Sequence, residues 1–127
     1  MEPRIKVAMP FAPAVPGLPM LTMPSLSILG QIDSVVNNTA IRNAYANALP
    51  PKALVEIEHA GHYAFSNGCF PSADCNPPTT LNQTEAHNIV LRWVLPFLEV
   101  HLVGDPSFEP FLTPPAPPGV VFQKVDP

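Results

Sequence analysis

Short apolar runs separated by proline-rich stretches dominate the pattern of this chain of 127 residues. Residues 5–9 form a short strand candidate, and residues 25–29 form a second, mostly apolar one of the kind buried on both faces in a parallel sheet. Residues 53–58 alternate, with Val55 and Ile57 on one face and two glutamates on the other. This alternation predicts a third strand near the edge of the sheet, with one side partly exposed to water.

The segment between the second and third predicted strands has the apolar spacing of an amphipathic helix. Asn37 or Asn38 can cap its amino terminus, and Pro50-Pro51 prevents its continuation because proline has no backbone N–H. One apolar face is predicted to contain Ile41, Ala44, Tyr45, Ala48 and Leu49.

A longer helix is predicted to end at Gly104, a residue type that often terminates helices. Its start has two candidate capping boxes, Thr80 with Gln83 and Asn82 with Glu85. Because Pro96 removes one hydrogen bond inside the helix, we expect a kink or a split there. A stripe facing the core is predicted to consist of Ala86, Val90, Trp93 and Phe97.

The order strand, strand, helix, strand, helix predicts an α/β fold with a mostly parallel sheet and flanking helices. The proline-rich segments at about 10–24 and 105–127 are expected to be extended or looped. Residues 1–127 suffice for one small domain, and the apolar fraction of 46% is typical of a globular protein.

Charge and hydropathy argue against several classes of protein. The net charge is −4 and the six Lys and Arg residues are dispersed, so no nucleic-acid surface is predicted. No apolar run approaches the roughly 20 residues of a membrane span. Prolines interrupt the first residues, which therefore do not resemble a signal peptide. No cofactor is predicted.

Two residues that follow predicted strands have the chemistry of a catalytic pair. Asp33 comes soon after the strand at 25–29, and His62 comes soon after the strand at 53–58. An imidazole acts as a general base when a carboxylate fixes its tautomer and stabilises the imidazolium. Both side chains would lie beyond the carboxyl ends of neighbouring strands, where open α/β sheets place their sites.

Each of these residues also has a structural interpretation when it is taken alone. Asp33 could be a turn residue or a helix cap, and His62 could be a buried histidine bonded to a carbonyl group. Their joint position favours the catalytic interpretation, and Gly30 and Gly61 suit the sharp turns that would orient them. His59 is expected to follow the more buried face of the third strand and to serve a structural role.

A nucleophilic serine is missing from this pattern. The nucleophile elbow of an α/β-hydrolase requires Gly-x-Ser-x-Gly, which none of the six serines satisfies: Ser25, Ser27, Ser34, Ser66, Ser72 and Ser107. We therefore expect a carboxy-terminal half whose serine comes from elsewhere. Its expected partner is the missing amino-terminal half, or a second copy that pairs with the open strand edge at residues 5–9.

Two cysteines follow the candidate base. Cys69 and Cys75 lie close together in a loop rich in Pro, Asn and Gly, so a disulfide is predicted if the protein is secreted or periplasmic, with two free thiols as the alternative. Together with His59 and His62 they also suggest a zinc site. Their spacing is longer than the usual two to four residues between zinc-binding cysteines, so the metal-binding domain is the weaker hypothesis.

Four segments, residues 4–13, 24–33, 60–65 and 101–105, together resemble the carboxy-terminal part of an α/β-hydrolase of the dienelactone hydrolase or platelet-activating-factor acetylhydrolase type. The resemblance implies a partial α/β-hydrolase domain over residues 1–127. It also implies a serine hydrolase of small-molecule carboxylic esters or related acyl compounds, with Asp33 as triad acid and His62 as triad base. The serine and the oxyanion-hole amides match nothing here, so this chain is expected to be inactive alone. A non-catalytic binding module with the same fold is the alternative.

Overall fold

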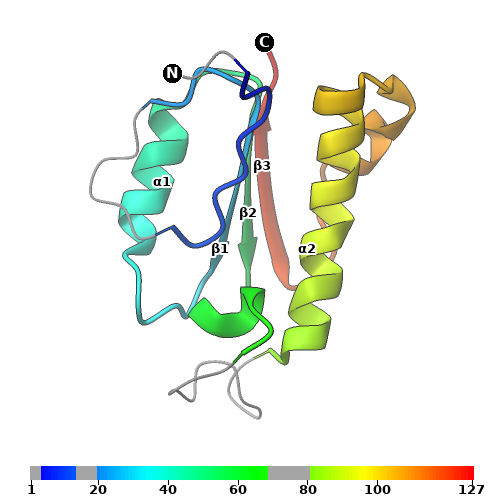
Figure 1. The fold of residues 1–127 in the computed structure, drawn as a ribbon. Coiled ribbons are helices and arrows are strands. Elements are labelled where there is room, and N and C mark those ends of the chain that lie inside the picture. The colour runs from blue at the N-terminus through cyan, green and yellow to red at the C-terminus, as the bar shows by residue number, and fades with distance from the viewer. Residues whose placement is uncertain (1–3, 14–19, 69–80) are drawn as a thin grey trace.

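The computed structural model describes residues 4–13, 20–68 and 81–127 (Figure 1). Three strands and two α-helices dominate it: β1 (Ser25–Gly30), α1 (Asn38–Asn47), β2 (Lys52–Ile57), α2 (Gln83–Leu98) and β3 (Val120–Val125). Shorter helical turns complete the order, a 3-10 helix at His62–Phe65, a π-helical turn at Glu99–Val103 and a second 3-10 helix at Pro106–Leu112.

A small mixed sheet lies between the two helices. Its strand order is β1-β2-β3, with β1 and β2 parallel and β3 antiparallel to β2. α1 covers one face of this sheet and α2 covers the other (Figure 1). The predicted α/β class is confirmed at this level, because the sheet has helices on both faces.

The first predicted strand is displaced toward its carboxyl end. Backbone hydrogen bonds join Ala8 and Ala12 to Pro24, Leu26 and Ile28, so residues 8–12 rather than 5–9 run parallel to β1. Pro10 accepts a bond from Ile28 but has no N–H to donate. The pairing therefore consists of isolated bridges at Ala8 and Phe11.

The position of β2 in the sheet differs from the prediction. β2 is the central strand, and both of its faces are buried. Glu56 is only 6% exposed, because Arg42 on α1 binds its carboxylate with two hydrogen bonds of 2.9 and 2.8 Å. The alternation of apolar and acidic residues in β2 therefore does not mean that one of its faces is exposed to water.

β3 was not predicted, because prolines dominate the segment in which it lies. Within the strand, however, Val120 and Phe122 are buried while Val121 and Gln123 are exposed. This alternation is typical of an edge strand with one face on the core. Its pairing with β2 explains why the expected edge position of β2 was wrong.

The predicted helix ends agree better with the structure than the predicted strands do. Asn37 caps α1 by accepting hydrogen bonds from the N–H groups of Thr39 and Ala40. Asn82 caps α2 by accepting a hydrogen bond from the N–H of Glu85, and its amide donates to the Glu85 carboxylate. The helical run ends at Gly104, which has a φ of 86°. α2 is not split at Pro96: it continues to Leu98 and passes into the π-helical turn.

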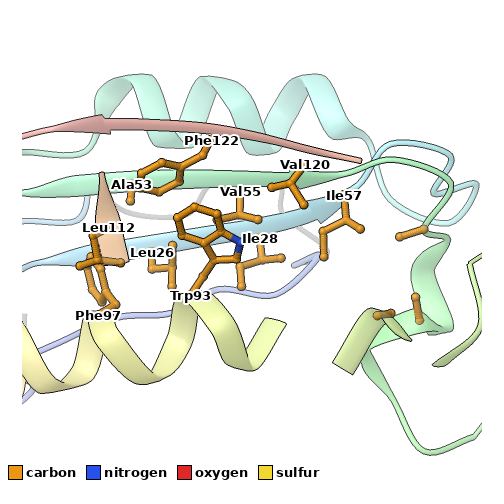
Figure 2. Close-up of a cluster of buried hydrophobic side chains, with 13 residues drawn as sticks. Leu26, Ile28, Ala53, Val55, Ile57, Trp93, Phe97, Leu112, Val120 and Phe122 are labelled. Atoms are coloured by element: carbon orange, nitrogen blue, oxygen red, sulfur yellow. The ribbon is translucent and has the colours of Figure 1, made fainter. Parts of the chain in front are cut away.

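The main core lies between the sheet and α2 (Figure 2). Trp93 stacks on Phe122 with ring centroids 4.2 Å apart, and Phe97 packs beside them in the same cluster. Of the predicted stripe, Val90 is only partly buried, whereas Ala86, Trp93 and Phe97 are buried. In the part of the chain that the structure describes, no helix has the length and apolarity needed to cross a membrane.

We predict that Arg42→Ala lowers the free energy of unfolding by about 1 to 2 kcal/mol at neutral pH, because it leaves the Glu56 carboxylate buried without its cation. The hydrogen bonds from Arg42 hold the pKa of Glu56 below its ordinary value of 4.5. A lowered folded-state pKa adds stability above the unfolded value, and this stability is lost as the pH falls through the folded value. Denaturant unfolding at pH 7 and below pH 4 tests this.

The difference between wild type and Arg42→Ala should shrink on acidification. Arg42→Lys is the matched control, because it keeps the positive charge but cannot form the bidentate hydrogen bonds to Glu56. Its loss in free energy of unfolding should be intermediate. An equal loss at both pH values would contradict the role assigned to this ion pair.

Candidate acid and base pair

Asp33 and His62, predicted as a pair from the sequence, lie in direct contact. The Nδ1 atom of His62 is 2.9 Å from the Oδ2 atom of Asp33. The carboxylate is fully buried, whereas one quarter of the imidazole surface remains exposed. The adjacent strands β1 and β2 are parallel and end at the same edge of the sheet (Figure 1). Asp33 comes three residues after the end of β1, and His62 comes five residues after the end of β2.

A tight turn after β1 fixes the position of Asp33. The backbone N–H of Asp33 donates to the Gly30 carbonyl, and its Oδ1 atom accepts from the N–H groups of Val35 at 2.8 Å and Val36 at 3.0 Å. The turn interpretation of Asp33 is therefore confirmed. One carboxylate oxygen closes the turn, and the other remains for His62.

The loop that carries His62 packs directly against the end of β1. A Cβ atom added at Gly30 would collide with the carbonyl of Ala60, so only glycine allows this close approach. The same carbonyl accepts the N–H of Ile32, which ties the acid loop to the histidine loop. His62 then begins a 3-10 helix that ends at Phe65.

Two of the predictions for this loop were wrong. The sharp turn is at His59, which has a φ of 58°, whereas Gly61 has an ordinary φ of −94°. His59 is exposed rather than packed on the face of Val55 and Ile57, because β2 already ends at Ile57 and the chain reverses. Its backbone still serves the fold, since its carbonyl accepts a 2.7 Å bond from Leu81.

The buried carboxylate determines which ring nitrogen of His62 carries the proton. An ionised carboxylate only accepts hydrogen bonds, so the Nδ1 atom that faces it is the N–H donor. In the neutral ring, the Nε2 atom then holds the basic lone pair. This is the tautomer that a general base of a catalytic triad requires.

His62 borders an open hollow of about 530 Å³ at this end of the sheet. Phe11 and Ala12 line it from the chain beside β1, and Tyr63 and Phe65 line it from the 3-10 helix. The walls around the imidazole are therefore largely aromatic and apolar. The sequence analysis did not single out Phe11, whose position at the end of a strand-like segment was the available signal.

The serines of the described residues do not complete a triad. Ser66 lines the hollow, but its single hydroxyl hydrogen has the carbonyls of Tyr63 and Gly68 as acceptors. Ser25 and Ser27 are buried within β1. Neither Ser34 nor Ser107 lines the hollow.

The cysteine predictions lie outside the described residues, as does Ser72. Cys69 and Cys75 are therefore not placed, and neither the disulfide nor the zinc hypothesis is tested. Among residues 4–13, 20–68 and 81–127, no group of three or more His, Cys, Asp or Glu side chains could hold a metal ion.

Comparison of the chain with protein-family models and with the sequences of curated proteins gives no match.

Proposed function

We propose that this chain supplies the acid and base of a serine hydrolase of the α/β-hydrolase type, acting on small-molecule carboxylic esters or related acyl compounds. Asp33 is the acid and His62 is the base. The proposal rests chiefly on one observation, the 2.9 Å contact between a buried carboxylate and a partly exposed imidazole. Its support also includes the hollow of about 530 Å³ that His62 lines.

In the proposed reaction, His62 moves one proton in each of two half-reactions. Its Nε2 atom takes the proton of the serine hydroxyl as the serine oxygen attacks the acyl carbon, and it gives this proton to the leaving alkoxide, which departs as the alcohol. In the second half-reaction Nε2 takes a proton from a water molecule as the water oxygen attacks the acyl-enzyme, and it returns that proton to the serine oxygen as the acid is released. Asp33 keeps the ring orientated and stabilises the imidazolium that forms in each step.

The nucleophile would come from polypeptide that pairs with the open side of residues 8–12. Since Ala8, Pro10 and Ala12 bond to the strand segment of Pro24 to Ile28, the backbone groups of Met9 and Phe11 face away from β1. A further parallel strand at this edge would end beside the hollow. A strand-to-helix turn at its carboxyl end could present a serine there.

The chain alone is expected to leave nitrophenyl acetate hydrolysis at the background rate, because a base without nucleophile and oxyanion hole has no covalent route. Adding the polypeptide that carries the serine should produce turnover. The measurement is initial rate against chain concentration, with His62→Ala as the control for non-specific histidine catalysis.

The proposal that the serine comes from another polypeptide would be contradicted if the chain alone showed turnover and His62→Ala abolished it. Serine-bearing polypeptides encoded beside this chain can each be added in turn. If none of them restores activity, the result would favour a non-catalytic module with the same fold.

A further inference from the structure

α2 has a second apolar face on the side opposite its core contacts. Leu91 and Leu95 are 49% and 55% exposed, Leu98 is partly buried, and Leu102 is 55% exposed in the π-helical turn that follows α2. α2 forms the layer that covers one face of the sheet, with Trp93 and Phe97 turned inward (Figures 1 and 2). The four leucines, here called the leucine seam, therefore point away from the sheet.

The spacing of the leucine seam is that of a two-stranded coiled coil. Leu91, Leu95 and Leu98 follow one another at steps of four and three residues, which places them at d, a and d positions of a heptad. Leu102 follows in the π-helical turn, which does not keep the α-helical register. In an antiparallel pair Leu95 lies opposite Leu98 of the other helix, and each Leu91 lies opposite the π-helical turn that carries Leu102. The π-helical turn at the carboxyl end also exposes Val103, which is 69% exposed, at the end of the seam.

The charges beside the seam select the same arrangement. Arg92 and Glu99 both occupy e positions on one flank, and Arg92 is exposed while Glu99 is half-buried. In an antiparallel pair, e positions face e positions, so each Arg92 meets Glu99 of the other chain. In a parallel pair, e positions face g positions, and Glu99 would face an uncharged Val94.

We propose that the leucine seam binds a second copy of this chain, with the two α2 helices antiparallel about a two-fold axis. The same surface patch then serves both subunits, as in an isologous dimer. The pairing buries apolar side chains that water otherwise covers, and it adds two ion pairs at the flank. This inference is independent of the proposed hydrolase function, since it uses no residue of the Asp33 and His62 pair.

Light scattering coupled to size exclusion tests the proposal. The wild-type chain should be a dimer at micromolar concentration, and Leu95→Asp should be a folded monomer, because Leu95 is 55% exposed. Its melting temperature should match that of the wild type diluted below the dissociation constant of the dimer. A wild-type monomer, or a Leu95→Asp dimer, would overturn the proposal. The second result would show that another surface, such as the edge at residues 8–12, holds the two copies together.

Charge exchange tests the orientation of the helices. Arg92→Glu alone and Glu99→Arg alone should each raise the dissociation constant about tenfold, because each places two like-charged pairs at the flank. An equal mixture of the two variants should recover wild-type affinity, since both cross pairs are then opposite in charge. Lys6→Glu mixed with Glu99→Arg is the control for net charge and should not recover it. A mixture no tighter than its components would refute the antiparallel pairing.

Discussion

His62→Ala is expected to lower turnover about a million-fold in the complete enzyme, meaning this chain together with the polypeptide that supplies the serine. The loss is large because the members of a triad act as a unit, so a serine without its base is a poor nucleophile. The variant should be somewhat less stable, because it leaves the Oδ2 atom of the fully buried Asp33 carboxylate without its His62 partner, but it should still fold, since the imidazole is partly exposed and lies outside the hydrophobic core. Turnover and melting temperature measured together separate the two effects.

His59→Ala is the matched control for this prediction. His59 lies only three residues from His62, but it is exposed in the turn after β2 and does not line the hollow. Turnover of this variant should remain near that of the wild type. If His59→Ala were folded but inactive while His62→Ala kept its turnover, the assignment of the base would be wrong.

Asp33→Asn is expected to lower turnover about ten-thousand-fold, because it reverses the tautomer of His62. The N–H groups of Val35 and Val36 donate to Oδ1 of Asp33, so an asparagine would keep its carbonyl oxygen at that position. Its NH₂ group would then face Nδ1 of His62 as a donor. The imidazole would accept there and carry its proton on Nε2, where it could not take a proton from serine.

Nitrogen chemical shifts of the His62 ring measure this change in the chain alone, without any partner. The wild type should show the proton on Nδ1, and Asp33→Asn should show it on Nε2. Asp33→Glu is a useful control, because it keeps the carboxylate while displacing it. The same tautomer in wild type and Asp33→Asn would contradict the geometry proposed for the pair.

Local signals account for the parts of the fold that were predicted correctly. Asn37 caps α1 through its own side chain, and Gly104 ends the long helical run with a positive φ. The short apolar run at β1 correctly predicted a buried strand, as is typical of parallel sheets. In each case, the residues that determine the structure lie within a few positions of the element they define.

Contacts between distant residues explain the parts that were missed. Glu56 indicated an exposed face, but Arg42 on a neighbouring helix neutralises it within the fold. β3 was not predicted because prolines precede it. It also depends on pairing with β2, a contact between distant residues that the local sequence does not reveal. Pro96 is tolerated because its ring is buried in α2, where tertiary packing overrides a local preference.

The candidate site was predicted from order and position along the chain. Asp33 and His62 could be proposed because each follows a strand, and adjacent parallel strands bring their carboxyl ends together. The loop packing that holds Asp33 and His62 in place could not be predicted in the same way. The close approach of Gly30 to Ala60 and the turn at His59 both depend on how two loops pack against each other.

Labelling by a fluorophosphonate, which reacts only with an activated serine, tests the central claim most directly. With this chain and the serine-bearing polypeptide together, the label should attach to one serine outside residues 1–127, and His62→Ala should nearly abolish the labelling. The chain alone should remain unlabelled. Labelling of Ser66 or another serine of this chain alone, or labelling that persists in His62→Ala, would contradict the account.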